Sequence, residues 1–156
     1  MNSIVAKAIA FKEALDDSFK DYQKQVLVNS KRLAEILMKN GFNCITGGTD
    51  THLVLLDLRG SGFTGKDAEK ALSDAGITTN KNAIPFDPQP PAIASGVRIG
   101  TPGVTTRGMK EQEIDLIGEL IIEAIKNGEN QEALISCKKR VNDLCSKFPI
   151  YKDLLI

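Results

Sequence analysis

The chain has 156 residues, of which 42% are apolar and 26% charged, and its 20 lysines and arginines are balanced by 20 aspartates and glutamates. These proportions are typical of one folded domain with a real core and exclude a disordered segment. The zero net charge argues against nucleic acid or a membrane surface as partner, and the lack of a long apolar run or signal segment favours a cytoplasmic protein.

The first 40 residues carry the strongest helical pattern. Apolar residues recur there at steps of three, four and seven: Ile4, Ala8, Phe11, Leu15, Phe19, Tyr22, Val26, Leu33 and Leu37. Asn40-Gly41 ends the pattern, because glycine readily takes the left-handed conformation found after a helix. A single helix of roughly 35 residues would be about 50 Å long. This is long for so small a domain, so we expect part of its stripe to lie against something outside this chain.

The middle of the chain alternates strands and turns with one helix. The expected strands are 42–46, 52–58, 76–82 and 96–100, with a turn at Gly47-Gly48 and a loop at 84–91 that holds four prolines. The continuous apolar character of 52–58 predicts a strand covered on both faces. Thr64 and Asp67 form a plausible capping pair for a helix that ends at Gly76.

Two further helices complete the predicted fold. Isoleucines and leucines at helical spacing predict the first over about 114–126, and the second extends over about 130–147. The element order predicts an α/β two-layer sandwich with a small, mainly antiparallel sheet. Cys44, Cys137 and Cys145 follow no metal-ligand or disulfide spacing, so we expect buried, inert thiols and no metal site.

The segment 60–67 nearly spells a phosphate-binding loop. The pattern G-x-x-x-x-G-K is complete and lies between an expected strand and an expected helix. The next position is Asp67 instead of the serine or threonine that would bind magnesium, and its negative charge would face a polyanion. We therefore favour a tight turn into a capped helix over a nucleotide site.

Arg98 and His52 are the candidate functional side chains. An arginine inside the apolar strand 96–100 is costly to bury alone. It either forms an internal ion pair with an acidic residue or binds a carboxylate through two parallel hydrogen bonds, and its surroundings in sequence favour neither. His52 is the only histidine; it has no evident partner, so a structural role is favoured over general-base catalysis. The turn 47–50 could bind an anion or serve as a hairpin connection.

Three segments in order resemble the C-terminal small domain of serine hydroxymethyltransferases. They are 47–59 (GGTDTHLVLLDLR), 76–85 (GITTNKNAIP) and 95–102 (SGVRIGTP), the last followed by TTRG at 105–108. The opening residues 1–15 are similar to the start of the long helix after the family's large domain. The resemblance implies the C-terminal domain of a fold-type I pyridoxal-phosphate enzyme. It divides the chain into 1–40, a helix leading from that large domain, and 41–156, the small domain.

The resemblance also implies roles for individual residues. Arg98 matches the arginine that binds the α-carboxylate of the amino-acid substrate, and Asn82 matches a residue near the pterin ring of tetrahydrofolate. It assigns no chemical role to His52 or Arg107. Phe86 stands where a small or polar residue is usual, a difference that bears on how this loop meets folate.

The complete enzyme would interconvert serine and glycine in one-carbon metabolism, as a homodimer with pyridoxal phosphate as cofactor. The Schiff-base lysine segment, the aspartate on the pyridine nitrogen and the histidine on the cofactor ring are not found in these 156 residues. They belong to the large domain, which would precede Met1. We therefore expect the chain alone to be inactive, because the covalent lysine is missing. The alternative is a nonenzymatic binding or oligomerisation module that retains the fold.

Overall fold

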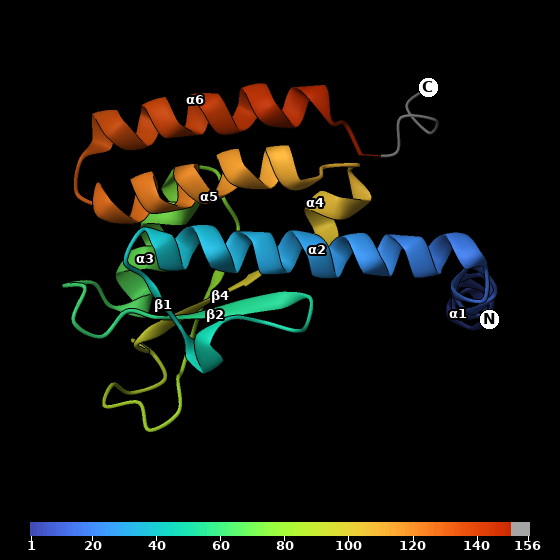
Figure 1. Ribbon diagram of the computed structural model, residues 1–156, viewed down its shortest axis with the longest axis horizontal. Coiled ribbons are helices and arrows are strands. Elements are labelled where there is room, and N and C mark those ends of the chain that lie inside the picture. Colours follow the sequence, from blue (N-terminus) through green and yellow to red (C-terminus); the bar gives the residue numbers. More distant parts are fainter. Residues whose placement is uncertain (151–156) are drawn as a thin grey trace.

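The computed structural model describes residues 1–150, which form six α-helices, one short 3-10 helix and four strands (Figure 1). The helices are α1 (Asn2–Ala14), α2 (Asp17–Lys39), α3 (Gly65–Asp74), α4 (Pro102–Thr106), α5 (Glu111–Lys126) and α6 (Gln131–Lys147). The strands are β1 (Asn43–Cys44), β2 (Leu53–Asp57), β3 (Asn80–Asn82) and β4 (Gly96–Gly100), and the 3-10 helix is η1 (Ile45–Gly47). No helix of this part of the chain is long and apolar enough to cross a bilayer.

The four strands form one antiparallel sheet in the order β1-β2-β4-β3. Because successive side chains of a strand point to opposite faces, Val97 and Ile99 of β4 face the helices while Arg98 faces away from them. The two-layer α/β fold with a small antiparallel sheet is thus confirmed.

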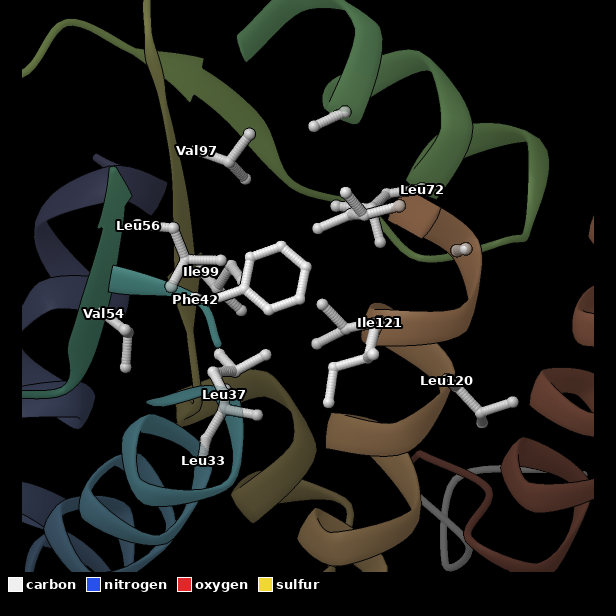
Figure 2. Packing of buried hydrophobic residues seen from close by; sticks show 14 of the residues in the cluster. Leu33, Leu37, Phe42, Val54, Leu56, Leu72, Val97, Ile99, Leu120 and Ile121 are labelled. Carbon is white, nitrogen blue, oxygen red and sulfur yellow. The ribbon is translucent and has the colours of Figure 1, made fainter. Parts of the chain in front are cut away.

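The hydrophobic core fills the space between the sheet and the helices (Figure 2). The labelled residues from both layers are Leu33, Leu37, Phe42, Val54, Leu56, Leu72, Val97, Ile99, Leu120 and Ile121. Helices α2, α3 and α5 supply the helical side of this core, and α6 lies on the outer side of α5, away from the sheet (Figure 1). On α6, Leu134, Cys137 and Leu144 are buried.

Helices α2 and α5 approach each other closely in the core. Gly118 of α5 leaves so little room that a Cβ there would lie 2.8 Å from Cγ2 of Ile36 on α2. At the rim of the same contact, Nε and Nη2 of Arg32 donate to the two carboxylate oxygens of Asp115 at 2.6 and 2.8 Å. Hydrogen bonds from Arg32 hold the pKa of Asp115 below its ordinary value. This contact fixes the helical layer on which the sheet rests.

The prediction of one long N-terminal helix is wrong. The helix breaks at Leu15-Asp16, because the Asp16 side chain accepts a hydrogen bond from the backbone N–H of Ser18 at 2.8 Å and so starts α2. No residue of α1 is buried, whereas the C-terminal half of α2 lies in the core. The division of the chain at residue 40 stays a prediction, and residues 151–156 lie outside the part that the structure describes.

The prediction that β2 is covered on both faces is also wrong for residues 1–150. Helices cover only the face on which Val54 and Leu56 lie, and Leu53 and Leu55 on the opposite face are half-buried. The sheet therefore has an outer face over which none of the described helices packs, and this face carries the candidate site.

Candidate functional site

Arg98 lies in the middle of the outer face of the sheet. It pairs with Leu55 of β2 on one side and with Asn80 of β3 on the other. Paired residues of neighbouring strands share a face, so these three side chains form one row across the sheet. The row has two origins: the period of two along β4, which the sequence shows, and the register of β3 against β4, which only the structure shows.

A depression of about 470 Å³ lies beside this row, and Arg98 and Asn80 are part of its lining. Its lining comes from the start of β2, the segment before β3 and the end of β4: His52, Leu53, Thr78, Thr79, Asn80, Arg98 and Gly100. The hydroxyl of Thr79 is buried and has no hydrogen-bond partner among the described residues. No carboxylate lines the depression. Arg98 therefore supplies a permanent positive charge that no acidic side chain of the lining offsets.

The guanidinium of Arg98 has no acidic partner among residues 1–150. The side chain is exposed, and its Nε donates to Oδ1 of Asn80 at 3.3 Å. The eight ion pairs of the described residues all involve other cations. The internal ion pair considered from the sequence is thus excluded there, and the terminal Nη groups of Arg98 are open to an anion.

The structure brings His52 to the same depression as Arg98. Its backbone carbonyl accepts from the backbone N–H and the hydroxyl of Thr101 at 3.0 and 3.3 Å, which ties the start of β2 to the end of β4. Its imidazole is exposed. His52 therefore has an evident structural role through its backbone, and its ring faces solvent.

Asn82 lies on the outer face but does not line the depression. It is paired with Gly96, and its Nδ2 donates to the carbonyl of Ala83 at 2.7 Å. Arg107 lies elsewhere: its Nε and Nη2 donate to the carbonyls of Phe148 and Cys145 at 2.7 and 2.8 Å, so it caps the C-terminus of α6.

The loop between β3 and β4 is closed by Asp87. Its carboxylate accepts from the backbone N–H groups of Ile84, Gln89 and Ser95 and from the hydroxyl of Ser95, at 3.1, 2.9, 2.9 and 2.6 Å. Burial alone would raise the pKa of Asp87, but these hydrogen bonds outweigh it and hold the pKa far below its ordinary value. Because Ser95 directly precedes β4, Asp87 fixes where the strand of Arg98 begins.

The phosphate-loop pattern at 60–67 does not form a phosphate site. The backbone N–H groups of Gly65 and Lys66, which would cradle a phosphate, donate to the carbonyls of Ala94 and Ile93 at 2.9 and 3.0 Å. Asp67 exchanges hydrogen bonds with Thr64 in a capping box, and these bonds lower its pKa. The predicted tight turn into a capped helix is confirmed.

The cysteines and the acidic residues within residues 1–150 form no metal centre. Cys145 is only half-buried, so the expectation of burial is wrong for this residue. Cys44 and Cys137 are buried, and burial raises the pKa of the Cys44 thiol to about 11 and also raises that of Cys137. Throughout residues 1–150, no group of three or more His, Cys, Asp or Glu side chains could hold a metal ion. Both thiols are therefore poor nucleophiles and poor ligands.

The described residues do not form a pyridoxal-phosphate site either. That cofactor requires a lysine for its Schiff base, and no lysine lines the depression. Lys81 points to the other side of the sheet, where its Nζ is 2.9 Å from Glu69 of α3. The depression presents the N–H donors of one arginine, with no carboxylate in the lining beside them.

The sequence did not identify Asn80, Thr78 or Thr79 as site residues. The period of two would have placed Asn80 on the face of Asn82, but its pairing with Arg98, 18 positions along the chain, depends on a strand register that the sequence does not show.

In a comparison with protein families, residues 1–121 match the family model described as "Serine hydroxymethyltransferase".

Proposed function

Because the chain belongs to the serine hydroxymethyltransferase family, we propose that it binds the α-carboxylate of serine or glycine through Arg98 for a pyridoxal-phosphate-dependent hydroxymethyl transfer. The observation that carries the proposal is the exposed guanidinium of Arg98, which has no acidic partner among residues 1–150 and borders a depression whose lining holds no carboxylate. A carboxylate accepts two parallel N–H bonds from such a group, in a geometry that an ammonium cannot offer.

The other substrate of the family is tetrahydrofolate. In our proposal Asn82 lies near its pterin ring, on the same sheet face as Arg98 and two residues from Asn80. Phe86 in the following loop is 99% exposed, and it is the nearest large apolar side chain in sequence that a planar ring could meet.

The family uses pyridoxal phosphate, which residues 1–150 are not equipped to hold. In our proposal other residues supply the cofactor lysine, and this chain binds and orients the amino acid. The isolated chain is then inactive, and the complete enzyme acts in the cytoplasm as a homo-oligomer.

The test joins this chain to the cofactor-binding domain of an active serine hydroxymethyltransferase. In that chimera, Arg98→Lys should raise the KM for serine roughly ten- to a hundredfold, because about 1.5–3 kcal/mol of charge-assisted bonding is lost. The affinity for pyridoxal phosphate, measured by its absorbance, should not change. Arg140→Lys on α6, far from the sheet, is the matched control. A serine KM unaltered by Arg98→Lys contradicts the proposal.

A second candidate function rests on α1. The apolar side chains of α1 and of Leu15 directly after it are largely exposed, with Ile4 at 68%, Phe11 at 69% and Leu15 at 85%. Such a surface suits a nonenzymatic binding or oligomerisation module. This function predicts that the chimera stays inactive with serine although it folds and binds pyridoxal phosphate.

A further inference from the structure

We propose that Asn80 is a positioning residue for Arg98: its amide oxygen holds the Nε–H of the guanidinium and leaves the two terminal Nη groups to take a carboxylate end-on. The hydrogen bond from Arg98 Nε–H to Asn80 is argued from the geometry alone. The end-on binding of a carboxylate rests on the function proposed above. Asn80 adds to that function a residue that sets the direction from which the amino acid is bound.

The contact follows from the strand register. Asn80 and Arg98 are paired residues of β3 and β4, and the distance from Arg98 Nε to Asn80 Oδ1 is 3.3 Å. The amide is oriented by its other end, since its Nδ2 donates to the carbonyl of Lys81 at 3.1 Å. An arginine has only donors, so the oxygen of the amide has to face it. The hydrogen bonds of the Asn80 oxygen and of the Asn80 nitrogen thus agree on the same orientation of the amide group.

Strand β3 is held in place from the helical side. The backbone N–H and the Nζ of Lys81 donate to the two carboxylate oxygens of Glu69 on α3, at 3.0 and 2.9 Å. An edge strand of three residues has few backbone hydrogen bonds of its own. Glu69 therefore fixes the strand through Lys81, and this fixes Asn80 beside Arg98.

Holding Nε–H restricts how the guanidinium can bind. Its five N–H groups offer a carboxylate two paired edges: the terminal edge of Nη1 and Nη2, and the side edge that includes Nε. Asn80 occupies the side edge. Asn82 cannot replace it, because Asn82 faces Gly96, which has no side chain. A carboxylate is left with the terminal edge.

The experiment follows the Arg98 Nε–H signal in the full ¹⁵N-labelled chain by NMR, with the signal assigned by its absence in Arg98→Lys. In Asn80→Ala, we expect exchange of this proton with water about two- to tenfold faster, the range for loss of one hydrogen bond. Asn82→Ala removes the same side chain from the same face of β3 and should leave the exchange rate unchanged. Asn80→Asp retains an acceptor oxygen and should retain the slow exchange.

Equal exchange rates in the native chain and in Asn80→Ala would overturn the proposal, provided that the backbone signals of Val97 and Ile99 show β4 to be intact. If Asn80→Ala disturbs those signals, Asn80→Asp decides: slow exchange supports the contact and fast exchange refutes it.

Titration with glycine separates the positioning role of Asn80 from the carboxylate-binding role of Arg98. Shifts confined to the Nη groups support end-on binding, and equal shifts at Nε refute it. No shift at Arg98 counts against the carboxylate role alone, because the exchange rates test Asn80 without any ligand.

Discussion

Two arginines nine residues apart have opposite surroundings. Arg98 is exposed and its terminal nitrogens are open to solvent, whereas Arg107 donates to two carbonyls at the end of α6. The sequence placed both in segments that resemble one family and assigned a role only to Arg98. The role of Arg107 could not be foreseen, because its partners Cys145 and Phe148 are about 40 positions away and act through their backbones.

Arg107→Ala should destabilise the chain by about 1–3 kcal/mol, since two charge-assisted hydrogen bonds at a helix C-terminus are lost. Urea denaturation followed by circular dichroism measures this change. Arg98→Ala is the matched control, and it should alter the free energy of unfolding by less than about 0.5 kcal/mol because it is exposed. A larger loss in the free energy of unfolding for Arg98→Ala than for Arg107→Ala would show that Arg98, and not Arg107, is the structural arginine.

Asp87 predicts a specific dependence of stability on pH. Its folded pKa is lowered by the hydrogen bonds it accepts, so it stabilises the fold above the unfolded aspartate value of about 3.9 and this contribution is lost as the pH falls towards the folded value. Asp87→Asn should therefore lower the urea midpoint more at pH 6 than at pH 3, because at pH 3 part of this contribution is already lost. An equal difference at both pH values would mean that the charge of Asp87 contributes nothing.

At the scale of helices and strands, the sequence predicted most elements and misplaced several of their ends. The start of α3 was predicted correctly because Thr64 and Asp67 carry a local capping signal. The break after α1 was missed, since the apolar stripe continues through Leu15 and Phe19 across it. Helix α4 was missed although Pro102 is typical of a first helical position. The ends of β1 and β3 depend on pairing with distant strands, which no local pattern reports.

The contact between α2 and α5 predicts an unusual outcome for a glycine in a helix. Gly118→Ala should gain up to about 1 kcal/mol in helix propensity, but the new methyl group would collide with Ile36. Overpacking of this kind costs about 1–3 kcal/mol, so we expect a net loss of stability. Thermal unfolding measures it. Gly103→Ala in α4, where a Cβ meets nothing within 4 Å, is the control and should be neutral or stabilising. A stabilising Gly118→Ala would contradict the close packing.

At the scale of the whole molecule, helix order and apolar spacing were sufficient to predict a two-layer fold. They could not show that one face of the sheet is left without helices, because the apolar run of β2 is equally suited to a strand buried on both sides. Leu53 and Leu55 are half-buried for this reason. The outer face and α1 together give the described chain two surfaces on which apolar groups meet solvent.

We expect the isolated chain to self-associate through α1. The side chains of Ile4, Phe11 and Leu15 expose apolar area that association would remove from water. Light scattering at rising protein concentration should show species larger than a monomer. Phe11→Glu should shift this equilibrium to the monomer, and Ser3→Glu, which adds the same charge to α1, should shift it far less. A native chain that stays monomeric at high concentration would refute this expectation.

The position of Arg98 on β4 has a consequence for the entropy of binding. Ordering a backbone residue costs about 1–2 kcal/mol, and ordering a long side chain costs about as much again. The backbone of Arg98 is already ordered by hydrogen-bonded neighbours on both sides, and its Nε is held by Asn80. An arriving anion therefore has little left to immobilise on the protein. A ligand as small as glycine can make only a few contacts. Because folding has already ordered the backbone and much of the side chain of Arg98, those few contacts can suffice for binding. The binding is still weak enough for rapid release.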